Sequence, residues 1–452
     1  MRKRTIVIGI VSAVIIAVLA TQIPGTYATV SAENYNNLGV QEYEKGNYEK
    51  AIEYFTKAIE LKPDYAEAYF NRGLAYFKTG SYYNREPYEK AIQDFTKAIE
   101  LKPDFVDAYY HRGLAYIQFV HYYRKPFSQD VIDKFNKAVN DFNKVLELDP
   151  NYALAYAGLG NAYYRYGEWV KANDFYDKAL ENKDWILDKA GKEGLAGVYY
   201  SKGRNLYQLQ KYSSDAVRNY EKAVELYPDL RIAVGHLVGA YMKMGEYEKV
   251  IETATHAIEL SEKEKKYGHM YAYYYRRGES YCMLGEYERA MADYEQALKL
   301  ALESKKPYRI YRVYISMAKC YARMGDEDKA REYYKKAVEL LSMSIEEAKQ
   351  ARRLVRYYVQ RGECYLNLGI YEKALEDFQH ALKVFPPGEY YKTYGKTDYY
   401  VEALKFIGIT YAKMGDIAKA KKTLNEALKL AEEYELVLTA DEIKAELEAL
   451  AD

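Results

Sequence analysis

The chain has 452 residues, and its 66 Lys and Arg residues balance its 66 Asp and Glu residues. A neutral chain has no global field that would draw it to nucleic acid, so nucleic-acid binding is disfavoured. Tyrosine is over-represented, with 55 copies against 13 Phe and 2 Trp. The 3 cysteines, Cys282, Cys320 and Cys364, match no zinc-site spacing, and we expect them to be buried as small apolar residues.

Residues 1–28 form the first predicted element, an export segment. Cations at residues 2–4 precede an apolar run, residues 5–20, which a Pro-Gly pair soon follows. This arrangement is typical of a secretory signal peptide cleaved after Ala28. Residues 5–23 are also just long enough to remain as a membrane anchor. Both alternatives place the cations in the cytoplasm and the rest of the chain outside it.

From residue 32 onward the chain repeats itself. Residues 48–63 (YEKAIEYFTKAIELKP) and 88–103 (YEKAIQDFTKAIELKP) are nearly identical, which indicates duplication. In most repeats, as in Gly39, Ala51 and Ala58, a small residue is followed by two alanines, and an aromatic residue such as Phe55 lies between the alanines; the sixth repeat has Val238 in place of the small residue. The spacing places the alanines and the aromatic on one helix face, where a second helix can approach closely. The repeat therefore predicts helix pairs.

Glycine is expected to end the first helix of most pairs in a left-handed cap. These glycines are Gly46, Gly80, Gly167, Gly245, Gly285, Gly325, Gly369 and Gly415. The pairs divide into units 1–4 (residues 32–184), units 5–6 (185–265), units 7–9 with a longer period (266–385) and unit 10 (401–435). Residues 191–194 and the Tyr-rich residues 386–400 are expected to be linkers. A capping box at Thr439–Glu442 predicts a last helix over 439–450, which covers the open end of the array.

Units 2 and 3 carry insertions at the same turn, residues 81–87 and 120–134. Both contain Tyr-Tyr, a basic residue and Pro. Insertions at one turn of successive repeats lie on one edge, so we expect a secondary contact surface there. Its residues are Tyr82, Tyr83, Arg85, Tyr122, Tyr123 and Arg124. The alternative is that these aromatics merely fold onto the rim of lengthened turns.

The small, aromatic, alanine and proline positions along residues 32–430 resemble those of the tetratricopeptide repeat (TPR) family. The resemblance implies an all-α, right-handed α-solenoid of about ten helix–turn–helix units, whose first helices line a concave groove that binds protein segments. The family's ligand-contacting offsets, transferred to this sequence, are Phe70, Leu74, Phe77, Tyr110, Leu114, Ile117, Tyr164, Tyr200, Arg204, Tyr207 and Tyr275. The alternative that some of these residues pack between neighbouring first helices stays open.

The cationic clamp by which some family members hold the carboxylate tails of chaperones is missing, because Asn36, Val40, Asp107 and His111 occupy its positions. The sequence also contains no phosphate loop, no two-histidine metal motif and no nucleophile elbow. We therefore expect no catalytic residues, no metal and no cofactor.

The expected function is a protein-binding scaffold or adaptor outside the cytoplasm, in contact with a membrane only through an uncleaved residue 5–23 segment. One alternative is a glycan- or peptidoglycan-binding envelope protein, since tyrosine rings also stack on sugars. Another is a membrane-anchored cytosolic regulator, which the cations at residues 2–4 oppose.

Overall fold

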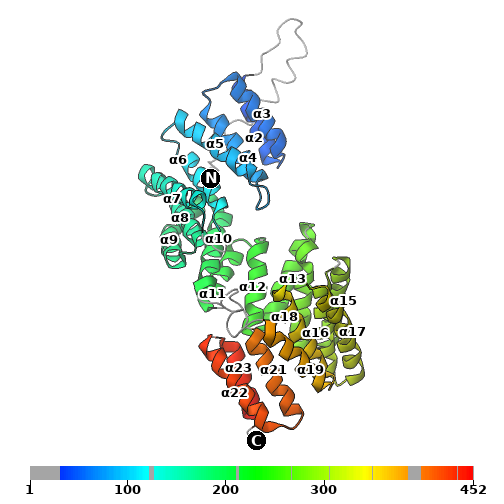
Figure 1. Ribbon diagram of the computed structural model, residues 1–452. Coiled ribbons are helices and arrows are strands. Elements are labelled where there is room, and N and C mark those ends of the chain that lie inside the picture. The colour runs from blue at the N-terminus through cyan, green and yellow to red at the C-terminus, as the bar shows by residue number, and fades with distance from the viewer. Residues whose placement is uncertain are drawn as a thin grey trace, which may run out of the picture. The chain divides into compact units, whose positions relative to one another are not determined.

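The computed structural model describes residues 31–121, 127–209, 213–265, 267–304, 306–348, 350–384, 399–434 and 436–450. All regular elements in these ranges are helical, and most successive helices pack against one another in antiparallel pairs (Figure 1). The all-α solenoid expected from the repeat is confirmed. The chain divides into two compact units, Met1–Leu237 and Val238–Asp452, which we call unit I and unit II.

Unit I holds the first five helix pairs. Its helices are α2 (Ala32–Glu44), α3 (Tyr48–Leu61), α4 (Ala66–Thr79), α5 (Glu86–Leu101), α6 (Val106–Tyr116), the 3₁₀ turn η1 (Ile117–Phe119), α7 (Gln129–Leu148), α8 (Ala153–Tyr166), α9 (Trp169–Glu181), α10 (Lys183–Leu209) and α11 (Ser214–Leu226). Helix α12 (Arg231–Met244) contains the boundary between the two units.

Unit II continues the same alternation. Its helices are α13 (Tyr247–Lys263), the 3₁₀ turn η3 (Tyr267–His269), α14 (Met270–Met283), α15 (Tyr287–Glu303), α16 (Pro307–Met324), α17 (Glu327–Glu346), α18 (Ala351–Asn367), α19 (Tyr371–Val384), α21 (Tyr399–Lys413), α22 (Ile417–Glu433) and α23 (Val437–Ala449). Tyr399 and Tyr400, expected in the linker, are the first residues of α21, and residues 386–398 lie outside the described residues.

In most pairs an aromatic ring of the second helix packs against a small residue of the first. The Phe55 ring of α3 lies so close to Gly39 of α2 that a Cβ at residue 39 would be 2.5 Å from it. Gly362 and Phe378 repeat this arrangement in α18 and α19. Since such a contact lies far inside normal van der Waals separation, a larger residue at these positions would force the helices apart. The small position of the repeat is therefore a packing requirement.

Most of the expected glycine caps are confirmed. Gly46, Gly167, Gly245, Gly285, Gly325, Gly369 and Gly415 all have positive φ angles, between 72° and 88°. Gly80 is the exception, because its φ of −70° and ψ of 150° are those of an extended residue. A glycine is needed at this position because a Cβ there would overlap the Tyr88 ring. The left-handed cap predicted at Gly80 is therefore wrong.

Two further local expectations are corrected. Within residues 191–194 only Gly191 leaves the helical conformation, with φ 67° and ψ −172°, and an unexpected helical segment precedes it in α10. Ile186 of that segment is fully buried, which explains why the segment is ordered. At the other end, α23 begins at Val437 rather than at a Thr439 cap, and its N-cap residue, Leu436, makes no side-chain capping bond. Helix α23 still covers the last pair, with Ile443 fully buried.

None of the helices in the described ranges is long and apolar enough to cross a membrane. The export segment of residues 1–28, with its alternatives of cleavage and anchoring, lies outside the described residues.

Candidate functional site: the inner faces of the first helices

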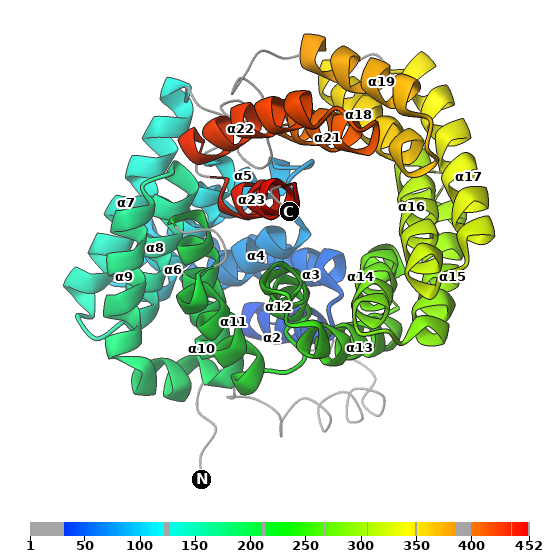
Figure 2. The same cartoon turned by 90° about the horizontal axis from the view of Figure 1, so that it is seen from below.

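The first helices of adjacent pairs form a continuous inner face within each unit. In unit I, α2 contacts α4, α4 contacts α6, α6 contacts α8 and α8 contacts α10. In unit II, α14 contacts α16 and α18 contacts α21. Adjacent second helices in the described ranges approach each other less closely. In unit II, α14, α16 and α18 lie on the inner side of α15, α17 and α19 (Figure 2). A ligand held by either unit would meet these first helices.

In unit I, the predicted groove residues of the second and third pairs pack against their neighbours. The Phe70 ring of α4 lies 4.8 Å from the Phe105 ring and 5.6 Å from the His111 ring. Tyr110 of α6 likewise lies 5.3 Å from Tyr152 and contacts Phe142. The remaining members of this group are half-buried: Leu74 and Phe77 pack on the cluster that contains Phe95, and Leu114 packs on the cluster that contains Phe142. These side chains fill the seams between helix pairs and expose only their edges.

Four other predicted groove residues are buried. Ile117 lies in η1 and is 3% exposed, and Tyr164, Tyr200 and Tyr275 are each at most 8% exposed. The Tyr200 hydroxyl lies 3.2 Å from His236 Nε2. These four residues expose little surface to a ligand. They fit the alternative that some of the expected groove residues pack between neighbouring first helices.

Arg204 and Tyr207, the remaining members of the predicted groove, are half-buried on α10. The Arg204 guanidinium stacks over the Tyr164 ring at 4.2 Å, and its buried Nε has no hydrogen-bond partner. Stacking on an aromatic face stabilises a guanidinium that is partly withdrawn from water. Arg204 is therefore the one predicted groove residue of unit I that brings a charge to the inner face.

The residue directly after the small residue of each first helix proves informative along the whole array. In pair order these residues are Val40, Leu74, Leu114, Asn161, Arg204, Gly239, Glu279, Lys319, Glu363 and Ile409. The first three are apolar, whereas the seventh to ninth alternate in charge. Sequence reasoning included this position in unit I and overlooked it in unit II. Applying the offset of Leu74 and Leu114 to every repeat would have found the charged residues.

In unit II these residues belong to a series of hydrogen-bonded and ion-paired side chains along the first helices, which we call the polar ladder. The Tyr275 hydroxyl of α14 donates to Glu279 Oε1 at 2.8 Å and lies 2.9 Å from Ser316 Oγ of α16. Burial raises the pKa of Glu279, although the Tyr275 hydrogen bond opposes the shift. One pair further on, Lys319 Nζ lies 2.7 Å from Glu363 Oε1 of α18. The charge of Glu363 raises the pKa of Lys319, which keeps this lysine protonated.

The ladder continues to the end of unit II. Lys405 of α21, only 9% exposed, forms an ion pair of 2.6 Å with Glu442 of the capping helix α23. Burial raises the pKa of Glu402, one turn earlier on α21, to about 7, and the charges of Glu363 and Glu442 add to this effect. The nearby cations Lys405 and Lys243 oppose it. A carboxyl group with such a pKa changes charge near neutral pH.

A hollow of about 320 Å³ opens on the inner face of unit II. It is lined by Met242, Glu279, Met283, Lys319, Arg323 and Asn367, among others, so helices α12, α14, α16 and α18 all contribute. Methionine supplies adaptable apolar contacts, while charged and amide groups can orient the backbone or side chains of a ligand.

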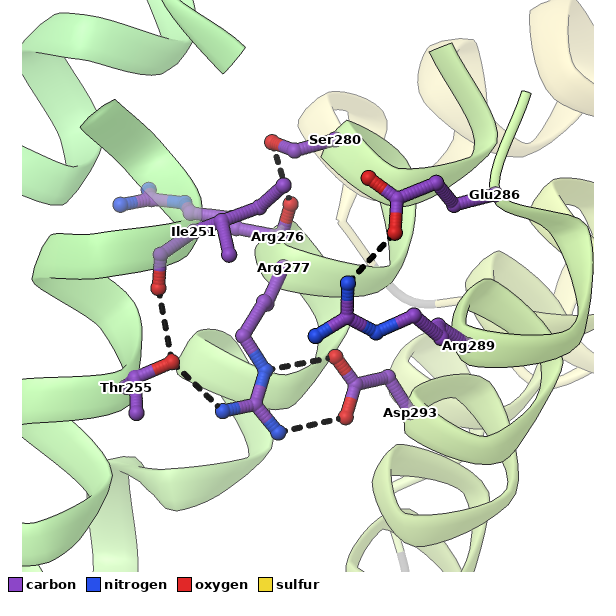
Figure 3. Close-up of polar contacts among 8 residues, drawn as sticks. All are labelled: Ile251, Thr255, Arg276, Arg277, Ser280, Glu286, Arg289 and Asp293. Atoms are coloured by element: carbon purple, nitrogen blue, oxygen red, sulfur yellow. Dashed lines mark hydrogen bonds and ion pairs between the residues drawn. The ribbon is translucent and has the colours of Figure 1, made fainter. Parts of the chain in front are cut away.

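Buried Arg–Asp clamps position these first helices. Arg277 of α14 donates to both carboxylate oxygens of Asp293 on α15, at 2.7 and 2.8 Å. Its third nitrogen donates to Thr255 Oγ1 of α13, in the preceding pair, at 2.8 Å (Figure 3). The same arrangement recurs in Arg72–Asp94–Thr56, Arg112–Asp141–Thr96 and Arg361–Asp377–Ser342. Each clamp fixes three successive helices.

The clamps can also be recognised in the sequence. In these four pairs Arg directly precedes the small residue and Asp directly precedes the aromatic, while the other pairs lack both residues. Such joint presence and absence indicates contact between the two positions. Burial raises the pKa of Asp94 although Arg72 opposes the shift, so the carboxylate depends strongly on its arginine.

The insertion surface is only partly described, because Tyr122, Tyr123 and Arg124 lie outside the described residues. Tyr82 is 40% exposed and Tyr83 95% exposed. The Arg85 guanidinium lies 5.3 Å from the Tyr82 ring and 5.7 Å from the Phe119 ring, and Tyr82 contacts His121 at 5.3 Å. The described edges of the two insertions thus meet through a cation stacked between aromatic rings.

No group of His, Cys, Asp or Glu in the described part of the chain is arranged to hold a metal ion. The expectations that the chain binds no cofactor and catalyses no reaction stay predictions.

Comparison with known proteins connects this geometry to a family. Models described as TPR repeat match residues 39–80, 81–118 and 133–167. Models described as tetratricopeptide repeat match residues 196–230, 269–343 and 353–433, so that about two thirds of the chain is matched in all. A curated relative, an uncharacterized protein of Methanocaldococcus jannaschii, is 53% identical over 51 residues, which are 11% of this chain and 59% of the relative.

Solved TPR structures resemble the chain more distantly. A thermophilic TPR protein of Thermus thermophilus is 20% identical, with a TM-score of 0.38, over 46% of this chain and 98% of that protein. Yeast Tom70 is 17% identical, with a TM-score of 0.35, over 92% and 95%. YrrB, described as a TPR protein with an unusual peptide-binding site, is 20% identical, with a TM-score of 0.31, over 46% and 93%. By its matched repeats, the chain belongs to the tetratricopeptide repeat family.

Proposed function

We propose that the protein is a non-catalytic scaffold that holds segments of other proteins against the inner faces of its first helices. The observation that carries the proposal is the inner face of unit II, where the charged residues Glu279, Lys319 and Arg323 line a hollow together with two methionines. A peptide or amphipathic helix presents backbone amides, charges and apolar side chains together, and this face offers partners for all three.

The proposal gives the two units different parts. The aromatic residues of unit I pack mainly against one another, so they stiffen that face and expose few polar groups. In unit II, the Lys319–Glu363 pair has a lysine side chain that is 49% exposed and remains accessible to a ligand. We therefore place the principal contact at the hollow of unit II, and a secondary contact at Tyr82, Tyr83 and Arg85 of unit I.

We further propose that the scaffold acts outside the cytoplasm. The support is the order of cations, apolar run and small residues in residues 1–28. Protease treatment of intact cells of the source organism tests this location. Digestion of the repeats while the cytoplasmic membrane is intact, with any outer envelope permeabilised, agrees with it, and full protection until the cytoplasmic membrane is lysed contradicts it in favour of a cytosolic regulator.

A charge swap tests the binding face. Peptides selected from a random library on the full chain are titrated against the double variant Lys319→Glu, Glu363→Lys, which keeps an ion pair but reverses its direction. We expect the selected peptides to bind at least about tenfold more weakly, because their charges now meet like charges. Helical circular dichroism and the melting temperature report whether the fold is kept.

The matched control reverses an ion pair away from the hollow. Lys444 of α23 and Glu432 of α22 lie 3.0 Å apart, so Lys444→Glu with Glu432→Lys is an equivalent swap. It should leave peptide binding unchanged. Equal binding by both swaps would place the peptide elsewhere. A chain that selects no peptide but retains envelope glycans in the same assay would support the glycan-binding alternative.

A further inference from the structure

Two of the three cysteines meet inside unit II. Cys282 lies on α14 and Cys320 on α16, which are first helices of adjacent pairs and contact each other. Both belong to one buried cluster that includes Tyr294 and Met317. Their separation of 38 residues matches no linear motif, so the repeat alone brings them together. All three cysteines are buried, as expected from the sequence.

The two thiols interact directly. The Cys320 thiol lowers the pKa of Cys282 by donating a hydrogen bond toward it, and the charge of Arg323 acts in the same direction. The same bond and burial raise the pKa of Cys320. Burial raises the pKa of the Tyr294 hydroxyl, and the charges of the nearby Cys282 and Cys320 sulfurs add to this shift. Cys282, Cys320, Tyr294 and Arg323 therefore form one cluster.

The two cysteines differ in access. Cys282 is 6% exposed and contributes to the wall of the hollow, whereas Cys320 is completely buried behind it. A reagent that enters the hollow meets Cys282 first. Cys364 provides the contrast, because it occupies the register of Cys320 in the next first helix and is fully buried. The charged neighbours that act on it are Glu363, Lys319 and Asp377, and no thiol is among them.

We propose that Cys282 and Cys320 are a redox-active dithiol that closes to a disulfide between α14 and α16. A thiolate is the attacking species in disulfide exchange, and the lower pKa belongs to the more accessible cysteine. The inference does not rest on the proposed function. It assigns the protein a covalent modification site on the wall of the hollow.

The oxidant is a small-molecule disulfide. The Cys282 thiolate attacks one of its sulfurs, which forms a mixed disulfide and releases one thiolate. Cys320 then loses its proton to solvent and attacks the Cys282 sulfur, which forms the Cys282–Cys320 bond and releases the second thiolate. Two protein thiols are oxidised and one disulfide is reduced to two thiols, so atoms and electrons balance.

Closure would fix the spacing of α14 and α16. Sulfur atoms in a disulfide are about 2 Å apart, much closer than two thiols in contact. Glu279 and Lys319 lie near these cysteines in their helices and line the same hollow. The redox state would therefore set the width of the hollow at its polar ladder. An oxidising compartment, such as the proposed extracytoplasmic location, would favour the closed form.

The test uses the full chain and oxidised glutathione. Reduced protein is incubated in buffers of increasing oxidised-to-reduced glutathione ratio, alkylated in acid-quenched, denatured form, and mapped by mass spectrometry without reduction. We expect the intact mass before alkylation to fall by two hydrogen atoms, the peptides containing Cys282 and Cys320 to be joined, and Cys364 to be alkylated in every sample.

Matched variants identify the bond. Cys364→Ser should lose two hydrogen atoms as the natural chain does, while Cys282→Ser and Cys320→Ser should not. The proposal is overturned if Cys282 and Cys320 remain alkylatable at every ratio, or if Cys282 retains glutathione without joining to Cys320. Because the linked peptide is measured in the unaltered chain, the outcome does not depend on how well any variant folds.

Discussion

Helices α4 and α6 of unit I and helices α16 and α18 of unit II occupy equivalent places in their repeats, yet they present different surfaces. In unit I the residue after the small position is Leu74 or Leu114, and the seam is filled by Phe70 and Tyr110. In unit II it is Lys319 or Glu363, and the two form an ion pair. The Arg–Asp clamps are the same in both units. The framework and the inner face can thus change independently.

The largest expected effect comes from breaking a clamp in one unit. Asp141→Ala in unit I and Asp293→Ala in unit II each leave an arginine without its carboxylate and should lower the free energy of unfolding by about 3 kcal/mol. Both tryptophans, Trp169 and Trp185, lie in unit I, so their fluorescence reports unit I while circular dichroism reports the whole chain. Asp293→Ala should shift only the circular dichroism trace in urea.

A shift of the tryptophan transition by Asp293→Ala as large as that by Asp141→Ala would mean that the two units unfold as one. The independent-unit interpretation would then fail, although the clamps would keep their role in stability.

The second prediction compares the effect on stability of Phe70, on the packed inner face of unit I, with that of Lys319, on the accessible inner face of unit II. Phe70→Ala removes a ring that contacts two helices, and it should destabilise unit I by about 2–3 kcal/mol. Lys319→Ala removes a half-exposed ion pair and should cost about 1 kcal/mol or less. Urea unfolding followed by fluorescence and circular dichroism measures both. Equal losses would contradict the assignment of the aromatic seam as structural.

The third prediction is an opposite pH dependence of the two units. Burial lowers the pKa of His111 in unit I to about 4 and raises the pKa of Glu402 in unit II to about 7. Between pH 4 and 6.5 the unfolded His111 binds more protons than the folded one, so unit I gains stability as pH rises. Between pH 4.5 and 7 the folded Glu402 holds its proton more tightly, so unit II loses stability as pH rises.

We expect each group to contribute about 3 kcal/mol across its window. Melting curves from pH 4 to 8, followed by both signals, should show slopes of opposite sign. His111→Gln should flatten the slope of unit I only, and Glu402→Gln that of unit II only. Either variant flattening both slopes would refute the assignment.

The smallest expected effect tests the shared framework. Gly46 in unit I and Gly415 in unit II have φ angles of 81° and 82°, with nothing within 4 Å of an added Cβ. Replacement by Ala should cost about 1 kcal/mol in each unit, because only the backbone is strained. Gly80→Ala should cost more, because its Cβ would overlap Tyr88. Thermal melting of the three variants measures the order, and a neutral Gly46→Ala would contradict it.

The fold was predictable because its rules are local and repeated many times. Small residue, alanine and aromatic recur at fixed spacing, so the helix pairs and the packing of Phe55 on Gly39 follow from the sequence. The site was less predictable, because burial depends on neighbours from other repeats. Tyr164 and Tyr200 match the family's contact offsets but are buried, and the meeting of Cys282 with Cys320 depends on the lateral spacing of α14 and α16, which no single repeat encodes.

The third hydrogen bond of each clamp, to Thr56, Thr96, Thr255 or Ser342, joins a repeat to the one before it. Clamps occur in the second, third, seventh and ninth pairs, and in the described ranges none occurs in the fourth to sixth pairs. The division between units I and II, at Leu237 and Val238, falls inside this clamp-free stretch. If the chain is pulled from its ends, we expect the repeats of this stretch to separate first, because no clamp there joins a repeat to the one before it.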